Sequence, residues 1–391
     1  MLKVVNIIED GRLAGPQIRI AEVARELGRY DIETTVVFPK HQSEVFKAKL
    51  DQYKVNAVRF PIHRLTRSKI DLLKYFLFLI YEIFLLYSFF KKEHFDIIHC
   101  SGGSWQYKGL IAGKLAGAKT LWHLNDTGMP SVILFLFRYI AAHFADGFIV
   151  AGQRVKDFYT AQLHSNDKPI IEIQAPVATA NFDPQYVKSD KAVESKQGIK
   201  IISVGNLNPL KGYEYFIQMA DRLNRYHKNL HFFIVGPDFE SQKIYVAKLH
   251  DLKQKLNLNN LKFYGACHDV RKVLKPADIY VCSSISEASP VSVWEAMSMG
   301  KAIVATDVGD VTRFINNEKN GFVVPIKDPE SLAEKVDILI RNPERRKKFG
   351  EEAMKVARQE LDVQIIARHH CDAYYSILSH NHSRHDYPTS T

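Results

Sequence analysis

The feature that most constrains the fold is a regular alternation of short apolar runs with amphipathic stretches along nearly the whole chain. Short apolar runs between helical stretches are typical of parallel strands whose sheet is covered by helices on both faces. The pattern therefore predicts an α/β protein with two doubly wound parallel-sheet (Rossmann-like) domains. The predicted strands are residues 2–8, 33–38, 55–59, 96–100, 119–123 and 147–150 in the first series, and 199–204, 230–235, 261–264, 279–282, 302–305 and 322–324 in the second.

The two series are separated by a turn-rich stretch without a strong period. A length of 391 residues also exceeds that of a usual single domain. We therefore predict an N-terminal domain of residues 1–174, a linker of residues 175–198 and a C-terminal domain of residues 199–360. A helix at 361–380 is expected to cross back to the N-terminal domain, and the polar residues 381–391 are expected to form a disordered tail.

Composition excludes several classes of protein. With 46% hydrophobic and 25% charged residues, the chain is neither a disordered protein nor a collagen-like fibre nor a polytopic membrane protein. The four cysteines have no CxxC spacing, so neither a disulfide scaffold nor a zinc ribbon is expected. The N-terminus runs directly into a strand pattern rather than a signal peptide, and we expect a cytoplasmic protein.

The net charge of +10 is concentrated in one region. Residues 40–74 carry nine Lys and Arg side chains against three acids, and they adjoin an apolar segment. This arrangement suits an anionic membrane surface, which Arg64, Arg67 and Lys69 would contact. The alternative is that the charges only keep the protein in solution. No zinc-finger or RNA-binding motif accompanies it, so nucleic acid is not expected as a partner.

The apolar segment at residues 72–90 is long enough to span a membrane. Its non-apolar residues are Lys74, Glu82 and Ser88, which form a narrow polar stripe on a helical wheel. A spanning helix would separate two strands of the same predicted sheet, 55–59 and 96–100. We therefore expect a helix that is buried or grazes a membrane.

The most informative motif is a pair of glutamates, Glu287 and Glu295, between two predicted strands. A proline in the first helical turn would place Glu287 in the loop before a helix and Glu295 inside it. An ordinary capped helix is the alternative, but Glu295 stands among apolar residues, where an acid is costly without a partner. The helix N-terminus would offer backbone amides to a phosphate, and the residues concerned are Ser289, Pro290, Val291 and Ser292.

A second motif joins the first strand of the second series to its helix, and it runs from Gly205 to Gly212 with the sequence Gly-Asn-Leu-Asn-Pro-Leu-Lys-Gly. A glycine turn with a lysine, here Lys211, at the carboxyl end of a first strand is where open α/β sheets bind anionic ligands. By itself, the pattern is equally compatible with an ordinary turn that carries a solvated lysine.

Together, the two motifs resemble those of the retaining glycosyltransferases of family 4, which have the two-domain GT-B architecture. Glu287 and Glu295 correspond to the family's E-x7-E motif, and Gly205 to Gly212 resembles its G-R-L-x-P-x-K-G loop. The resemblance covers residues 199–340 most strongly. It implies two domains facing across a cleft, with the donor in the C-terminal domain and the acceptor in the N-terminal domain.

The resemblance also implies roles for these residues. Glu287 would orient the hydroxyls of the donor sugar, Glu295 would hold the ribose, and Lys211 with the helix N-terminus would hold the diphosphate. The leaving diphosphate would help to deprotonate the acceptor hydroxyl. Where the family usually has arginine, this chain has Asn206, whose neutral amide would bind a diphosphate less tightly.

The first half of the chain resembles the acceptor domains of the family more loosely. Gly15 lies in the loop after the first strand, where the resemblance implies close approach of the backbone to the donor diphosphate. His123 ends a predicted strand at which the family often has a histidine facing the donor sugar, so we assign it a catalytic role. A packed, hydrogen-bonded histidine is the alternative. Asn125 and Asp126 follow and are expected on the acceptor side.

We therefore predict an enzyme that transfers a sugar from a UDP-, GDP- or ADP-linked donor to an acceptor hydroxyl with retention of configuration. The acceptor would be a carbohydrate or a lipid-linked molecule used in cell-surface polysaccharide, lipopolysaccharide or glycolipid synthesis, in the cytoplasm or at the inner face of the membrane. No metal-ligand spacing is present, and neither a metal nor a cofactor is expected. An epimerase or phosphorylase of the same architecture, and a catalytically silent sugar-nucleotide-binding subunit at a membrane, remain alternatives.

Overall fold

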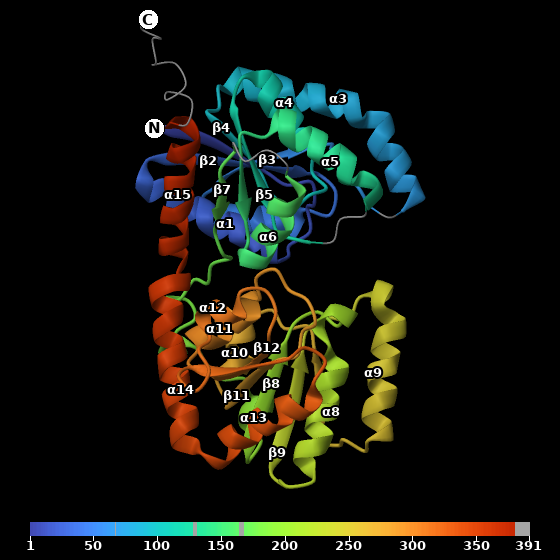
Figure 1. Cartoon of the computed structure of the whole chain (residues 1–391), viewed down its shortest axis with the longest axis vertical. Helices are drawn as coiled ribbons and strands as arrows, with labels where there is room; N and C mark the ends of the chain where they lie inside the picture. The colour runs from blue at the N-terminus through green and yellow to red at the C-terminus, as the bar shows by residue number, and fades with distance from the viewer. Residues whose placement is uncertain (67, 128–130, 164–167, 380–391) are drawn as a thin grey trace, which may run out of the picture. The chain divides into compact units, whose positions relative to one another are not determined.

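The structure is a computed structural model that describes residues 1–66, 68–127, 131–163 and 168–379, except for the side chains of residues 131–133. The chain forms two compact units: Met1–Pro176 with Val363–Thr391, and Val177–Asp362 (Figure 1). Most of the predicted linker, residues 177–198, thus belongs to the second unit. One reason is that the Val177 amide donates to the Leu361 carbonyl at 2.9 Å. The tail predicted at 381–391 lies outside the described residues.

The N-terminal unit is built on a seven-stranded parallel sheet in the order β3-β2-β1-β4-β5-β6-β7. Six of its strands were predicted from the sequence. The seventh, β7, was not, because three half-buried residues are too few to show a period. The strands are Leu2–Ile7 (β1), Ile32–Pro39 (β2), Asn56–Phe60 (β3), Ile97–Cys100 (β4), Lys119–Leu124 (β5), Gly147–Val150 (β6) and Ile170–Glu172 (β7).

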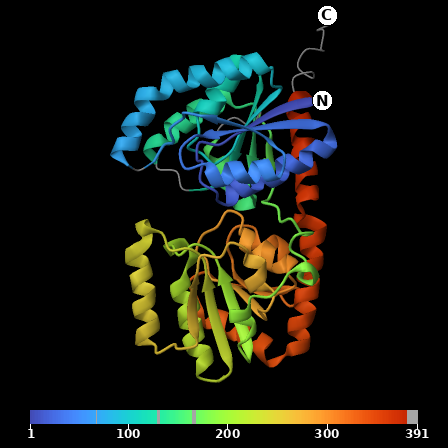
Figure 2. The same ribbon diagram turned by 180° about the vertical axis from the view of Figure 1, so that it is seen from behind.

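Helices cover both faces of this sheet. On one face the C-terminal helix α15 packs beside α1, and Figure 2 shows the two helices next to each other. Ile366, Tyr374 and Ile377 of α15 join a core cluster with strand residues such as Val4 and Leu121. The helices of this unit are Gly15–Leu27 (α1), Glu44–Gln52 (α2), Lys69–Glu93 (α3), Lys108–Ala116 (α4), Ser131–Phe144 (α5), Gln153–Gln162 (α6) and Val363–Ser379 (α15).

Helix α3 buries one acidic residue beside Tyr75, Leu86 and Phe90 and leaves many large apolar side chains exposed. Glu82 is fully buried, and one of its carboxylate oxygens lies 2.6 Å from Nζ of the equally buried Lys108 of α4. Many large apolar side chains of α3 face outward, so of the two alternatives expected for this segment, a buried helix or one that grazes a membrane, the structure excludes the buried one. By length and composition, α3 could also cross a membrane. The exposed apolar residues are Ile70, Leu72, Leu73, Phe76, Leu77, Phe78, Ile80, Tyr81 and Phe84.

The C-terminal unit contains a six-stranded parallel sheet in the order β10-β9-β8-β11-β12-β13, and all six strands were predicted. Two buried apolar clusters lie on its two faces, one against α10, α11, α12 and α14 and the other against α8, α9 and α13. The fold class expected from the sequence is therefore confirmed. The strands are Ile199–Val204 (β8), Leu230–Val235 (β9), Leu261–Gly265 (β10), Ile279–Cys282 (β11), Ala302–Thr306 (β12) and Gly321–Val324 (β13).

The helices of this unit begin at local sequence signals. Asp328 caps α13 by accepting the Ser331 amide at 3.0 Å, and Asn342 caps α14 by accepting the Arg345 amide at 2.8 Å. Each cap is followed by a proline, which suits the first helical position. The helices are Lys191–Glu194 (α7), Tyr213–Asn224 (α8), Lys243–Lys255 (α9), Val270–Leu274 (α10), Val291–Ser298 (α11), Val311–Phe314 (α12), Pro329–Arg341 (α13) and Pro343–Val356 (α14).

Candidate functional site

In the C-terminal unit, glycines allow the loops after β8, β9 and β11 to approach closely. Gly212 has a φ of 59°, and a Cβ at this residue would lie 2.3 Å from the Ser283 carbonyl oxygen. Similarly, a Cβ on Gly236 would lie 2.0 Å from the carbonyl oxygen of Gly205. That carbonyl also accepts the Tyr213 hydroxyl at 2.7 Å. The predicted Gly205–Gly212 loop is thereby held against the loop that carries Glu287.

This approach brings two predicted site residues into contact. Lys211 Nζ lies 2.5 Å from Glu287 Oε1, and the Ser284 hydroxyl donates to the same oxygen at 2.8 Å. Burial lowers the pKa of Lys211, but the nearby Glu287 carboxylate outweighs burial, and the pKa is raised overall. Lys211 therefore carries a full positive charge at neutral pH. Both side chains keep some exposure, 21% for Lys211 and 16% for Glu287, so a ligand can reach them.

Glu295 lies inside α11, as predicted, and is half-buried. Its charge acts on the same lysine, because the Glu295 carboxylate is among the groups that raise the pKa of Lys211. The two glutamates of the E-x7-E pattern therefore both lie within electrostatic range of one ammonium group. An ammonium group with two carboxylates nearby suits a ligand that presents phosphate to the lysine and hydroxyls to the acids.

The N-terminus of α11 offers fewer free amides than expected. Pro290 is the N-cap rather than a first-turn residue, and it has no N–H group. The Val291 amide donates to the Ser289 carbonyl at 3.0 Å, so it is already used within the chain. The Ser292 hydroxyl accepts that of Tyr280 at 2.8 Å. The expectation of amides pointing outward all along residues 289–292 is therefore corrected.

Asn206, which replaces the family's usual arginine, is exposed at the tip of its loop. Its carbonyl accepts the Asn208 amide at 2.9 Å, and the Asn208 side chain in turn accepts the Leu210 amide at 2.9 Å. These turn bonds hold the loop in shape without a charged side chain. In the C-terminal unit, the positive charge of this loop is thus carried by Lys211.

In the N-terminal unit, Gly15 begins α1 and is exposed, with no atom within 4 Å of where a Cβ would stand. Its place at the carboxyl end of β1 agrees with the sequence prediction. The neighbouring Pro16 takes the first turn of the helix. Among the described residues of this unit, nothing crowds the backbone at Gly15. Its nearness to a donor diphosphate stays a prediction.

His123 is fully buried rather than exposed to a ligand. Its Nδ1 lies 2.7 Å from Nη1 of Arg19 and 3.2 Å from Nε2 of His99, and its ring stacks on His99 at 5.3 Å. Burial, reinforced by the charge of Arg19, lowers the pKa of His123 well below its usual range. The imidazole is therefore a neutral core group, which corrects the expectation that it faces a donor sugar and agrees with the packed alternative.

His123, His99 and Arg19 form a buried cluster, which we call the histidine cluster, and two further members come from α15 near the end of the chain. Tyr374 of α15 has its hydroxyl 2.8 Å from His99 Nδ1, and His370 donates to the Ile366 carbonyl at 2.8 Å. Burial lowers the pKa of His370 to about 3. The cluster thus joins β4, β5 and α15 through uncharged rings, and the Arg19 guanidinium of α1 contacts His123.

Asn125 and Asp126 lie together at the end of β5 and remain partly exposed. Asp126 accepts the Ser104 amide at 3.4 Å and the Tyr159 hydroxyl at 3.4 Å. Gly103, in the loop after β4, has a φ of 91°, and a Cβ there would lie 2.1 Å from an Asp126 oxygen. The glycine pair at 102–103 was not singled out from the sequence, although its position after a strand was an available signal.

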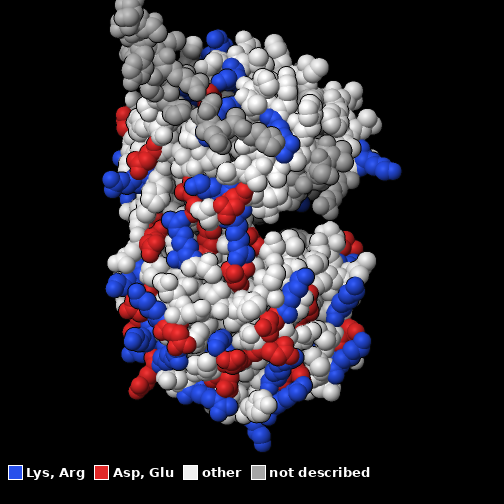
Figure 3. Space-filling view, in the orientation of Figure 1, with Lys and Arg blue, Asp and Glu red and all other residues white. Residues whose placement is uncertain are grey.

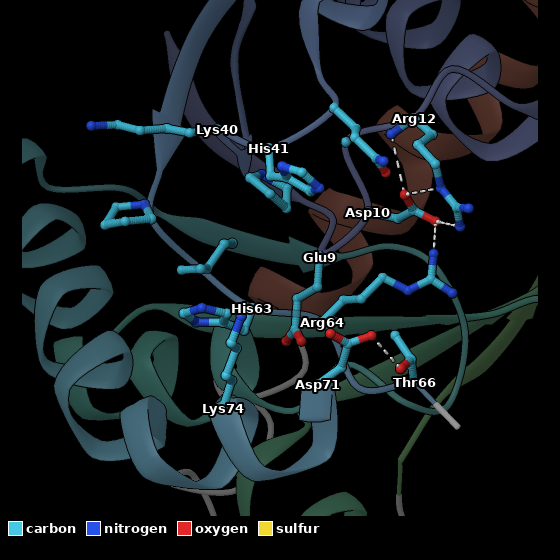
Figure 4. Close-up of a pocket in the computed structure, with 15 residues that line it drawn as sticks. Glu9, Asp10, Arg12, Lys40, His41, His63, Arg64, Thr66, Asp71 and Lys74 are labelled. Atoms are coloured by element: carbon cyan, nitrogen blue, oxygen red, sulfur yellow. Dashed lines mark hydrogen bonds and ion pairs between the residues drawn. The ribbon is translucent and has the colours of Figure 1, made fainter. Parts of the chain in front are cut away.

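The main hollow of the N-terminal unit lies at the carboxyl ends of β1, β2 and β3. It has a volume of about 700 Å³, and Figure 4 shows the side chains that line it. A smaller hollow of about 440 Å³ adjoins it and shares Glu9, Asp10, Arg64 and Thr66 with it. Sequence reasoning assigned no role to Glu9, because a single acid after a strand has no pattern of its own.

The residues predicted to contact a membrane lie in different settings. Arg64 forms an ion pair with Asp10 and lines both hollows, so it does not stand free on a surface. Lys69 is exposed at the start of α3. Arg67 lies outside the described residues. Within the described ranges, no three His, Cys, Asp or Glu side chains are grouped so that they could hold a metal ion.

Comparison with known proteins agrees with this geometry. Residues 187–356 match the family described as Glycosyl transferases group 1, and residues 14–180 match the one described as Glycosyltransferase Family 4. An Escherichia coli protein named UDP-Gal:alpha-D-GlcNAc-diphosphoundecaprenol alpha-1,3-galactosyltransferase is 28% identical over 276 residues, which is 66% of this chain and 68% of that protein.

A second relative matches nearly end to end. It is the Campylobacter jejuni N,N'-diacetylbacillosaminyl-diphospho-undecaprenol alpha-1,3-N-acetylgalactosaminyltransferase, 24% identical over 88% of this chain and 92% of its own length. Among solved structures, Anabaena Alr3699/HepE in complex with UDP and glucose is similar with a TM-score of 0.80 at 18% identity, covering 96% of this chain and 100% of that one.

Proposed function

Since the chain belongs to the family 4 glycosyltransferases, we propose that it transfers a sugar from a nucleotide-diphosphate sugar to a lipid-diphosphate-linked acceptor, with retention at the anomeric carbon. The observation that carries the proposal is the contact between Lys211 and Glu287 at the carboxyl end of a parallel sheet. That position is where open α/β sheets bind nucleotides. A UDP-linked donor is the first choice, because the E. coli relative is named for UDP-Gal and the Anabaena structure holds UDP.

In this proposal, donor binding rearranges the ion pair between Lys211 and Glu287. The Lys211 ammonium turns to the donor diphosphate, and the Glu287 carboxylate accepts hydrogen bonds from the sugar hydroxyls. Glu295, one helix turn and more beyond the loop, accepts from the ribose hydroxyls. Charge that develops on the leaving diphosphate is balanced by Lys211, which supports a reaction without a metal ion.

The transfer itself needs no nucleophile from the protein. The bond between the anomeric carbon and the diphosphate oxygen breaks, and the acceptor oxygen bonds to that carbon from the same face. The acceptor's proton passes to an oxygen of the leaving diphosphate, which departs as a nucleoside diphosphate. Retention follows because bond breaking and bond making take place on one face of the sugar.

A lipid-linked acceptor is supported by two kinds of observation. Two relatives are named for substrates joined through a diphosphate to undecaprenol. In this chain, α3 exposes a row of apolar side chains, and Figure 3 shows a largely uncharged surface where α3, α4 and α5 lie. Apolar side chains of this kind can enter the headgroup boundary of a bilayer. We therefore propose that the protein works at the inner face of the membrane.

Purified protein and a panel of UDP-, GDP- and ADP-sugars test the proposed reaction. With a diphosphate-linked acceptor, we expect release of nucleoside diphosphate and a product whose anomeric configuration matches that of the donor by NMR. Conversion of the donor without an acceptor would indicate an epimerase, and a requirement for inorganic phosphate would indicate a phosphorylase. Binding of donors without any turnover would indicate a silent subunit.

Vesicle co-sedimentation tests the membrane proposal. Ile80 on α3 is 82% exposed and Ile244 on α9 is 78% exposed, so Ile80→Ser and Ile244→Ser remove similar apolar surface from two different helices. We expect Ile80→Ser to reduce binding to anionic vesicles several-fold and Ile244→Ser to leave it unchanged. Equal recovery of both variants with the vesicles would contradict docking through α3.

A further inference from the structure

The larger hollow of the N-terminal unit has more cationic groups than its acids can balance. Its lining includes four Lys or Arg side chains and two histidines against three acids. The acids already have partners. Asp10 is bound by Arg12 and Arg64, Asp71 accepts the Thr66 hydroxyl at 2.8 Å, and Glu9 lies 3.8 Å from the Lys108 ammonium.

His63 contacts Glu82 of α3, so three basic residues of the hollow have no acidic partner so far. Lys40 and His41 follow β2, and Lys74 lies on the first turns of α3. None of the three contacts an acid within the part of the chain that the structure describes. Figure 4 shows the Lys74 side chain extending from α3 towards His63 at the edge of the hollow. A ligand with several negative charges would supply the missing partners.

The smaller hollow has a different chemistry. It is lined by the Trp105 indole and by the amide side chains of Gln17 and Gln106. Gln17 is 2% exposed, and its Nε2 donates to the Asp10 carbonyl at 2.8 Å. Its Oε1 is buried, and no hydrogen-bond donor for it is found among the described residues. The same holds for Oε2 of Glu9, because the Lys108 ammonium, at 3.8 Å, is too far away for a hydrogen bond.

Buried oxygens without donors are rare and call for an explanation. Hydroxyl groups of a saccharide would donate to them, and the indole offers an apolar face to the sugar ring. The two hollows share Glu9, Asp10, Arg64 and Thr66, so they are directly adjacent. A ligand in which a sugar is joined directly to a diphosphate has the same order of groups.

We propose that the larger hollow binds the diphosphate of the acceptor and the smaller hollow binds the saccharide ring attached to it. The Asp10–Arg64 ion pair lies at the boundary between the two subsites. The lipid continues from the diphosphate along the exposed apolar face of α3, whose first turns supply Lys74. This assignment rests on the proposed function, since it names where that reaction's acceptor is held.

Titration calorimetry with inorganic pyrophosphate tests the diphosphate subsite. We expect Lys40→Ser/Lys74→Ser to weaken binding about tenfold or more, as loss of charged contacts does. Lys92→Ser is the matched control, because Lys92 lies on the same helix about 27 Å further along and outside the hollow. A Lys211→Ala arm identifies any pyrophosphate bound in the C-terminal unit, which the Lys40 and Lys74 changes should not affect.

A second ligand separates an acceptor diphosphate from a membrane headgroup. Glycerol 1-phosphate, the soluble part of phosphatidylglycerol, should compete poorly with pyrophosphate for the wild-type protein. Equal competition would show a headgroup site and overturn the assignment. Unchanged pyrophosphate affinity in Lys40→Ser/Lys74→Ser would also overturn it.

The sugar subsite is tested by Gln17→Leu, which keeps the side-chain volume and removes the buried oxygen. With farnesyl diphosphate carrying α-N-acetylglucosamine as acceptor, we expect a raised acceptor KM and an unchanged pyrophosphate affinity. An unchanged KM overturns the assignment of this subsite. Donor binding and slow donor hydrolysis should persist in Lys40→Ser/Lys74→Ser, Lys92→Ser and Gln17→Leu. Their absence from the wild type would instead refute the proposed function, while the pyrophosphate titrations would still report on the hollow.

Discussion

Replacement of Lys211 by alanine is expected to weaken nucleoside diphosphate binding in a way that depends on Glu287. The Lys211 ammonium is the charged group of the Gly205–Gly212 loop, and it is held 2.5 Å from the Glu287 carboxylate. Its raised pKa keeps it charged at neutral pH. In the proposed complex, this ammonium binds the donor diphosphate, and Asn206 supplies no second charge.

The structure allows the size of the effect to be worked out in two parts. A hydrogen bond to a charged group contributes about 1.5–3 kcal/mol, which corresponds to a rise in Kd of roughly 10- to 150-fold. In addition, Lys211→Ala leaves the Glu287 carboxylate without its cation next to the bound diphosphate, and this repulsion weakens binding further. The double variant Lys211→Ala/Glu287→Gln lacks that repulsion, so it should bind more tightly than Lys211→Ala alone.

Calorimetric titration of UDP into the wild type, Lys211→Ala, Glu287→Gln and the double variant measures this coupling as a double-mutant cycle. Lys243→Ala is a suitable control, since Lys243 lies on α9 and is exposed, with a partner, Glu240, on the same surface. Unchanged affinity in Lys211→Ala would place the diphosphate elsewhere. A double variant that binds no better than Lys211→Ala would show that Glu287 lies too far from the diphosphate to act on it.

Three further outcomes are expected. Glu287→Gln should lose most sugar transfer while UDP affinity stays within about twofold, because its proposed partner is the sugar; near wild-type turnover would refute this role. Lys108→Met should lower the free energy of unfolding by about 3–5 kcal/mol in urea titrations, because it leaves the Glu82 carboxylate buried without its cation. Lys108→Met/Glu82→Leu should recover much of this loss of stability, since both partners of the buried pair are then gone. Equal losses of stability in the single and the double variant would mean that the pair is not coupled. The pKa of His370 is about 3 in the folded protein and 6.5 in the reference state, so its contribution to stability is present above pH 6.5 and is lost as the pH falls towards 3, by about 1.4 kcal/mol per pH unit. His370→Gln should therefore make the free energy of unfolding less dependent on pH in this acid range. An unchanged slope would exclude a neutral buried ring.

The strands could be predicted from sequence because each is a continuous apolar run whose cause is local. Parallel strands covered on both faces must be apolar throughout, so their pattern is visible without knowledge of their neighbours. The short β7 strand was missed because it is only three residues long and half-buried. Its place in the sheet depends on pairing with β6, which no local pattern reveals.

The sequence also indicated the residues of the donor site but not all of their partners. Glu287 and Lys211 were singled out by motif, and the structure places them in contact although they are 76 residues apart. The expectation of free amides at the start of α11 was partly wrong, since the Val291 amide is used in a turn with the Ser289 carbonyl. Turn geometry of this kind depends on the whole loop rather than on one proline.

By itself, the sequence determined the two α/β units, the E-x7-E pair and the lysine loop, because periodicity and short motifs depend on neighbours along the chain. Tertiary structure alone decided that His123 is a buried neutral ring, that Glu82 turns inward to Lys108 and that two hollows open beside Glu9. Each of these features depends on side chains from distant segments that meet only after the sheet has formed. Burial and charge pairing set their protonation and accessibility, and neither quantity can be read from a residue's position in the chain.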